Sequence, residues 1–133
     1  MTKLSLTSSS PAETRALGER LGARCGPGDW IGLSGELGAG KTCLVQGLAR
    51  GLEVDPQVAV TRPTFVILQT YPGRIPLHHL DLYRLSRPAE LDAIGYHQLV
   101  EGDGTCVVEW AEQVDGAVPG RGLLIRLLLV DET

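Results

Sequence analysis

Gly35-Glu36-Leu37-Gly38-Ala39-Gly40-Lys41-Thr42 matches the pattern G-x-x-x-x-G-K-[ST] at every position. The stretch follows a short apolar run, 30–33, and leads into a segment, 41–48, that is expected to be helical. In loops of this kind the glycines let the backbone wrap around phosphate oxygens, and the amides donate beside the positive end of the helix. The sequence therefore predicts a strand, a loop and a helix with a nucleotide phosphate site. The alternative is a glycine-rich turn with an incidental lysine.

The residues of this loop have distinct expected roles. Lys41, which shares the chain with only one other lysine, should reach the β and γ phosphates. The Thr42 hydroxyl is the expected ligand of a magnesium ion, which keeps several waters and takes phosphate oxygens as its other ligands. The expected nucleotide-binding residues of the loop are Gly35, Gly38, Ala39, Gly40, Lys41, Thr42 and Cys43.

Two acidic residues stand where a magnesium-nucleotide site needs them. Glu109 follows the apolar run 105–108 at the end of an expected strand, and Asp81 lies in the segment 79–84, on or just after another strand. One carboxylate can hold magnesium, directly or through water, and a second can orient the attacking water. We therefore expect Lys41, Asp81 and Glu109 to be catalytic, and we leave open which carboxylate is the main magnesium ligand. A solvated charge is the alternative for each carboxylate.

The segment Thr61-Arg62-Pro63-Thr64 resembles a switch loop, in which Thr64 could sense the γ phosphate or a water molecule. A simple proline turn is the alternative. His78 and His79 are expected to pack or to hydrogen-bond rather than to bind metal, because a phosphate-held magnesium ion prefers oxygen ligands. The expected metal site thus contains oxygen ligands alone.

Length and composition limit the class of protein. The 133 residues, 43% hydrophobic and 21% charged, fit a single domain over residues 1–133. No apolar run approaches the roughly 20 residues of a membrane span, and the N-terminus lacks a signal-peptide pattern, so a cytoplasmic protein is expected. The net charge of −4 disfavours direct binding of nucleic acid. Because the chain has no asparagine, it has no N-K-x-D loop to read guanine, which favours ATP over GTP.

Capping and turn residues predict the other elements. Ser10-Pro11-Ala12-Glu13 begins a helix that Gly26-Pro27-Gly28 ends. Two strand-like runs, 65–71 and 75–82, flank the turn Pro72-Gly73-Arg74 and predict an antiparallel hairpin. The remaining expected elements are a helix over 88–99 and strands over 105–110 and 123–130. The last strand is apolar enough for us to expect it to be buried on both faces.

Several motifs together give the chain a resemblance to a known family. They are G-E-L-G-A-G-K-T at 35–42, P-T-F at 63–65, H-L-D-L-Y-R-L at 79–85, A-E-L-D-A-I-G-Y at 89–96 and V-E-W-A-E at 108–112. In their order and spacing the chain resembles the bacterial TsaE family, formerly called YjeE, over most of its length. The D-L-Y-R and E-W segments are not general features of ATPases, so this resemblance is more specific than a P-loop alone.

The resemblance implies an ATPase of the α/β class, with a P-loop NTPase-like three-layer fold whose mixed sheet contains an antiparallel hairpin. It implies ATP or ADP and Mg²⁺ as ligands. It also implies two partner proteins, TsaB and TsaD, which transfer a threonylcarbamoyl group to adenosine 37 of tRNA, so that tRNA is contacted only through the partners. The family's functional positions fall on Lys41, Thr42, Asp81 and Glu109, with Thr42 and Glu109 as magnesium ligands. Trp110 would lie near the nucleotide, although a buried aromatic residue at a strand edge is an equally good interpretation.

Two residues depart from the family's pattern. Cys43 stands where the family often has a second threonine, so any phosphate contact from that hydroxyl is lost or weakened. Arg62 stands where serine usually precedes the switch proline. Two other functions remain open at this point, a stand-alone small-molecule P-loop kinase and a nucleotide-sensing module without turnover. The short segment between Thr64 and the strand before Glu109 leaves little room for the lid of a kinase.

Overall fold

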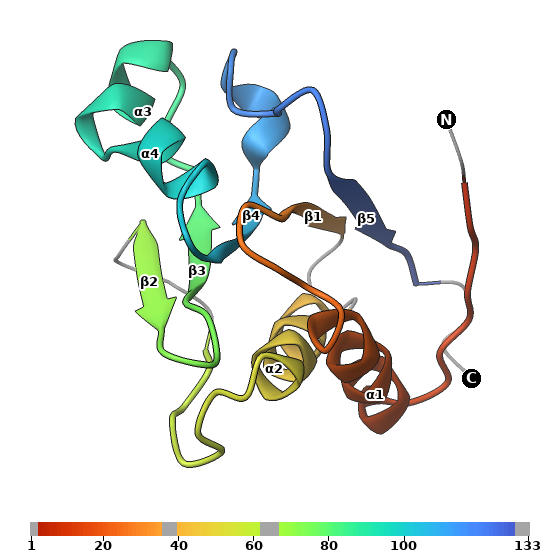
Figure 1. Ribbon diagram of the computed structural model, residues 1–133. Helices are drawn as coiled ribbons and strands as arrows, with labels where there is room; N and C mark the ends of the chain where they lie inside the picture. The colour runs from red at the N-terminus through yellow and green to blue at the C-terminus, as the bar shows by residue number, and fades with distance from the viewer. Residues whose placement is uncertain (1–2, 36–39, 62–66, 130–133) are drawn as a thin grey trace.

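A five-stranded mixed sheet forms the centre of the molecule (Figure 1). The computed structural model describes residues 3–35, 40–61 and 67–129. In these ranges the strands are β1 Trp30–Gly35, β2 Leu68–Tyr71, β3 Leu77–Asp81, β4 Thr105–Glu109 and β5 Leu123–Leu127. They lie in the order β2-β3-β4-β1-β5, with β2 antiparallel to β3 and all other neighbours parallel. The carboxyl ends of the parallel strands therefore meet at one edge of the sheet.

Helices cover both faces of the sheet, so the fold has three layers (Figure 1). On one face lie α1 Pro11–Gly22 and α2 Lys41–Gly51. On the other face lie α3 Pro88–Ala93 and α4 Tyr96–Val100. A single 3-10 turn, Ala111–Gln113, follows β4 within the described ranges.

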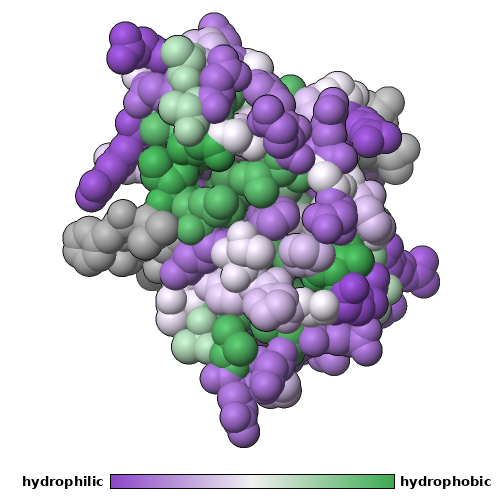
Figure 2. Space-filling model, turned by 60° about the vertical axis from the view of Figure 1, so that its left-hand side comes forward, coloured by the Kyte–Doolittle hydropathy of each residue, from purple (hydrophilic) through white to green (hydrophobic). Residues whose placement is uncertain are grey.

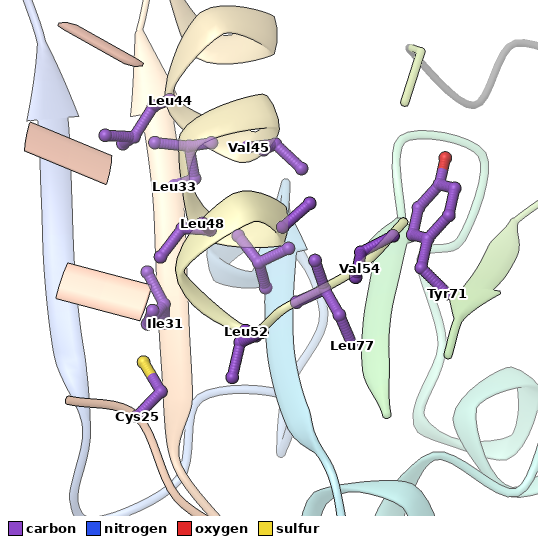
Figure 3. Close-up of a cluster of buried hydrophobic side chains, with 12 residues drawn as sticks. Cys25, Ile31, Leu33, Leu44, Val45, Leu48, Leu52, Val54, Tyr71 and Leu77 are labelled. Carbon is purple, nitrogen blue, oxygen red and sulfur yellow. The ribbon is translucent and has the colours of Figure 1, made fainter. Parts of the chain in front are cut away.

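Two apolar clusters hold these layers together. On the α2 side, Leu44, Val45 and Leu48 of the helix lie against Ile31 and Leu33 of β1 (Figure 3). On the other side, buried side chains from β3, β4, α3 and α4 form a second cluster, which also contains the tryptophan of β1. Because neighbouring residues of a strand point to opposite faces, one short apolar strand supplies both clusters.

The helix α1 lies so close to α2 that only glycine fits between them. Gly18 and Gly22 of α1 face Gly47 and Gly51 of α2, and a Cβ atom at any of the four would overlap the backbone of the opposite helix. At Gly18, a Cβ atom would lie 2.5 Å from the carbonyl oxygen of Leu44. This close contact fixes the position of α1 relative to the helix that begins at the end of the glycine-rich loop.

The structure confirms most elements expected from the sequence. The hydroxyl oxygen of Ser10 caps α1 by accepting a hydrogen bond from the backbone N–H of Glu13 at 3.1 Å. β1 and α2 follow in the expected order, and β2 and β3 form the expected antiparallel hairpin. The observed architecture is the predicted α/β three-layer fold with a mixed sheet.

The expected single helix over 88–99 is wrong. α3 ends at Ala93, and Gly95 has a left-handed backbone, with φ 70°, before α4 begins at Tyr96. Glycine adopts this conformation without steric cost. The break lets Leu91 and Tyr96 both be buried, although residues at that spacing would lie on different sides of one continuous helix.

The expectation that the last strand is buried on both faces is also wrong. β5 lies at the edge of the sheet and pairs, among the described strands, with β1 alone. The side chains of Leu123 and Leu124 are 45% and 69% exposed. An apolar run shows that a strand is hydrophobic, but it does not show where the strand lies in the sheet.

On the face drawn in Figure 2, a connected apolar area lies among hydrophilic side chains, on the side of the molecule where β2 forms the sheet edge. This area lies over the second apolar cluster, whose outer members are only partly buried. Across the part of the chain that the structure describes, no helix has the length and apolar character needed to cross a bilayer.

Candidate nucleotide-phosphate site

The start of α2 is built to receive an anion. Gly40 precedes the helix with a left-handed backbone, φ 103°, that disfavours other residues. The first bond of the helix runs from the Leu44 amide to the Gly40 carbonyl oxygen at 3.0 Å, which leaves the amides of Lys41, Thr42 and Cys43 outside the helix ladder. These N–H groups lie at the positive end of the helix dipole. The geometry here agrees with the phosphate site that the sequence predicts.

Asp81 and Glu109 are the last residues of two neighbouring parallel strands. The register of β3 and β4 places Asp81 directly beside Glu109. Every second residue of a strand lies on the same face of the sheet. Leu77 therefore shares a face with Asp81, and Val107 shares one with Glu109. Leu77 and Val107 pack beneath α2, so both carboxylates lie on the face that α2 covers. Glu109 is buried and Asp81 is half-buried. The two carboxylates expected at strand ends thus lie side by side at the carboxyl edge of the sheet.

The carboxylate of Glu109 joins the helix to the sheet. Its Oε1 atom lies 3.4 Å from Nζ of Lys41, and its Oε2 atom lies 2.8 Å from Nε2 of His79. Burial by itself would raise the pKa of Glu109, but the hydrogen bond and charge of His79, together with Lys41, hold that pKa below its ordinary value. Glu109 is therefore ionised at neutral pH despite its burial.

Asp81 has a different environment. Its Oδ1 atom accepts a hydrogen bond from the backbone N–H of Tyr83 at 2.9 Å, which fixes the chain as it leaves β3. Among the described residues, no hydrogen bond or ion pair connects Asp81 to Lys41 or Glu109. The structure therefore brings the three expected catalytic residues to one edge of the sheet but connects only two of them directly.

Trp110 follows β4 directly and has an uncommon backbone conformation. Its φ of 64° is left-handed, a conformation that is strained for a bulky residue. The indole ring meets the ring of Tyr83 edge-on, with centroids 5.1 Å apart. Trp110 and Lys41 line the same shallow pocket, together with Leu33, Ser34, Gly35 and Glu112. Trp110 thus lies beside the lysine, and its place near a nucleotide stays a prediction.

The start of α1 also borders the site. A Cβ atom on Gly40 would lie 3.6 Å from Cγ2 of Thr14, which is ordinary contact distance. The neighbouring Arg15 donates from Nη1 to Sγ of Cys43 at 3.7 Å. Cys43, where the family often has threonine, therefore faces an arginine of the adjacent helix.

Sequence reasoning identified some of these residues and missed others. The expectation that His79 packs or hydrogen-bonds is confirmed, but its partner Glu109 was not predicted. A signal was present, because His79 lies two positions before Asp81 and so shares its face of the strand. Arg15 was missed, and its helix carries no pattern that points to the loop.

Three predicted nucleotide-binding residues, Gly38, Ala39 and Thr64, lie outside the described residues, so their roles stay predictions. Within the described ranges, no group of three or more His, Cys, Asp and Glu side chains is arranged to hold a metal ion. The available donors, a threonine hydroxyl at the helix start and one buried carboxylate, fit an ion that takes its other ligands from phosphate and water. The predicted magnesium ligands, Thr42 and Glu109, are compatible with this arrangement.

Comparisons with known proteins give consistent matches in sequence. A family model described as threonylcarbamoyl adenosine biosynthesis protein TsaE matches residues 8–132. The tRNA threonylcarbamoyladenosine biosynthesis protein TsaE of Treponema pallidum is 41% identical over 120 residues, 90% of this chain and 87% of that protein. The protein of that name from Bacillus subtilis is 37% identical over 126 residues, 94% of this chain and 77% of that protein.

A solved structure shows the same architecture. The crystal structure of YdiB from Bacillus subtilis superposes with a TM-score of 0.75 at 34% sequence identity, covering 94% of this chain and 76% of that one. The match in sequence and the match in fold point to one family. This chain belongs to the TsaE family of threonylcarbamoyl adenosine biosynthesis proteins.

Proposed function

We propose that this protein binds and hydrolyses ATP in the cytoplasm as a subunit required for threonylcarbamoyladenosine modification of tRNA at adenosine 37. Membership of the TsaE family supports a role in this pathway. The ATP chemistry is supported by one observation above all, the ion pair between Lys41 and Glu109 at the open start of α2. A lysine, a carboxylate and amides outside the helix ladder at one point are the parts that a magnesium-nucleotide site needs.

Each residue of the site would have a defined task. Lys41 would bind the β and γ phosphates, and the amides at the start of α2 would bind phosphate oxygens. Thr42 and Glu109 would hold magnesium, which supplies a positive charge that polarises the phosphoryl group when it is bound. Glu109 suits this task better than Asp81, because Glu109 already contacts the lysine. Asp81, beside it in the register, would orient the attacking water.

Partner proteins, rather than this chain, would make the contacts with tRNA. The chain carries a net charge of −4, so it gains little from releasing the counterions of a nucleic acid. We infer that TsaB and TsaD are the partners, as the resemblance implies, and that ATP turnover in this subunit acts on their complex.

An ATPase assay with and without TsaB and TsaD tests this function. We expect phosphate release that appears, or rises sharply, only when both partners are present, and that is lost in Lys41→Ala. Lys3→Ala, which removes the other lysine of the chain, is the matched control and should behave as wild type.

Other results would refute the proposal in distinct ways. A phosphorylated small molecule, found after incubation with ATP and a mixture of metabolites, would indicate a stand-alone kinase. ATP binding with no hydrolysis under any partner condition would indicate a nucleotide-sensing module. Unchanged ATP affinity in Lys41→Ala would show that the phosphate site lies elsewhere.

A further inference from the structure

The two carboxylate oxygens of Glu109 have partners of different kinds. Oε1 faces the ammonium group of Lys41 at 3.4 Å, and Oε2 faces the ring nitrogen Nε2 of His79 at 2.8 Å. The Glu109 side chain is only 5% exposed, so water does little to stabilise its charge. The two side chains that accompany it therefore decide how well the buried carboxylate is tolerated.

His79 is held in place by the sheet. It lies within β3, where the register pairs it with Gln69 of β2 on one side and with Val107 of β4 on the other. Its side chain is 2% exposed. Because its backbone is paired on both sides and its side chain is buried, His79 is the more firmly held of the two partners of Glu109.

Lys41 is held much less firmly. It is the first residue of α2, and its charge lies at the end of a flexible four-carbon chain. If ATP binds as proposed above, the ammonium group must turn toward the phosphates. Oε1 of Glu109 then loses its partner while the carboxylate remains buried, so the partner at Oε1 is exchangeable.

We propose that His79 is a positioning residue, which keeps the carboxylate of Glu109 in place while Lys41 moves from Glu109 to a bound phosphate. This inference rests on the proposed ATP site. Without His79, Lys41 would be the only one of these two partners left to Glu109, and the phosphates would have to compete with that buried carboxylate for the ammonium group. Glu109 would then hold the lysine more tightly and would be free to change orientation once the lysine left.

The ring of His79 is suited to this role. A carboxylate only accepts hydrogen bonds, so Nε2 must carry the proton that is shared with Glu109. Nδ1 is buried and has no hydrogen-bond partner in the part of the chain that the structure describes. The one useful contact of the ring is thus a single N–H donor, which the amide of glutamine can also supply.

Calorimetric titration of ATP, with and without Mg²⁺, tests the role of His79. We expect His79→Leu to bind ATP about 10- to 100-fold more weakly than wild type, the range seen when partners of metal ligands are removed. His79→Gln should restore most of the affinity, because it keeps an N–H donor. The matched control is His78→Leu, since the adjacent histidine faces the other side of the sheet, bonds to Thr70 Oγ1 at 2.9 Å and should leave ATP affinity unchanged.

A double variant separates positioning from a merely structural role. Glu109→Gln removes the charge that competes for Lys41, so His79→Leu combined with Glu109→Gln should recover ATP affinity in the absence of Mg²⁺. A general loss of packing at His79 would not be reversed by a change at Glu109. Thermal unfolding of each variant shows whether the fold is retained.

A measurement on the unaltered protein covers the case in which His79→Leu does not fold. Nitrogen-15 NMR of the imidazole should show a proton on Nε2 in the nucleotide-free protein, whether or not Nδ1 is also protonated, and a proton on Nδ1 alone would overturn the proposal. Equal ATP affinity in wild type and folded His79→Leu would refute the role of His79 alone. A wild-type protein that binds no ATP would refute the proposed function and this inference together.

Discussion

A methyl group added at Gly18 is expected to force α1 away from α2. The new Cβ atom would lie 2.5 Å from the Leu44 carbonyl oxygen and 3.1 Å from both Cα of Gly47 and the amide nitrogen of Leu48. Cβ atoms in proteins essentially never lie closer than 3.0 Å to such atoms. One helix must therefore shift by at least about 0.5 Å, because no side-chain rotation can move a backbone oxygen.

Two effects of opposite sign determine the change in the free energy of unfolding. Overpacking typically destabilises by about 1–3 kcal/mol. Replacing glycine by alanine inside a helix stabilises by up to about 1 kcal/mol. We therefore expect Gly18→Ala to lose about 1–2 kcal/mol, which corresponds to a fall in Tm of about 4–8 °C for a chain of this length.

Urea unfolding and calorimetry of wild type, Gly18→Ala and Gly26→Ala measure this effect. Gly26 is the matched control, because nothing lies within 4 Å of its Cβ position, so its variant should stay within about 0.5 kcal/mol of wild type. ATP affinity should also fall in Gly18→Ala, since α1 carries Thr14 beside Gly40. If Gly18→Ala is as stable as wild type or more so, the close helix contact is refuted.

Three further predictions concern the site and the second apolar cluster. Thr42→Val should lose the magnesium-dependent part of ATP binding and keep most of the metal-free part, because it removes one oxygen ligand; equal losses with and without Mg²⁺ would contradict this. Glu109→Gln should weaken magnesium-nucleotide binding and turnover together, whereas Asp81→Asn should keep ATP bound but lower partner-stimulated hydrolysis, and the reverse pattern in binding and rate measurements would exchange the two roles. Tyr96→Phe should lose about 1–3 kcal/mol at neutral pH, because the buried hydroxyl donates to the Ala117 carbonyl oxygen at 2.7 Å. Burial raises the pKa of Tyr96 to about 12, so wild-type stability should fall between pH 10 and 12, where only the unfolded phenol loses its proton, and unfolding curves of Tyr96→Phe should lack that part of the decline.

The strand and the helix start that frame the proposed phosphate site could be predicted from the sequence because their determinants are local. Glycines at fixed spacing, one lysine and a following helical segment are enough to specify a strand, a loop and a helix start. The same is true of the cap at Ser10 and of the hairpin turn. The position of Glu109 at a strand end could be read from the apolar run 105–108, whereas the run 75–82 continues past Asp81 and did not show that β3 ends there.

The helix break at Gly95 and the edge position of β5 depend on packing against the rest of the molecule. The pattern of 88–99 fits a helix, and only the need to bury Leu91 and Tyr96 on the same sheet decides that the chain breaks at Gly95. An apolar strand can be central or at an edge, and the order of strands in the sheet makes β5 an edge.

The contacts within the site were likewise decided by tertiary structure. His79 and Glu109 lie 30 residues apart and meet because β3 pairs with β4 in one register, and a shift by one residue would turn the histidine to the other face. Thr14 reaches Gly40 because four glycines let two helices approach. The chemical groups of the candidate site can be read from the sequence. Which of them touch depends on strand register and helix packing between residues far apart in the chain, so these contacts appear only in the folded structure.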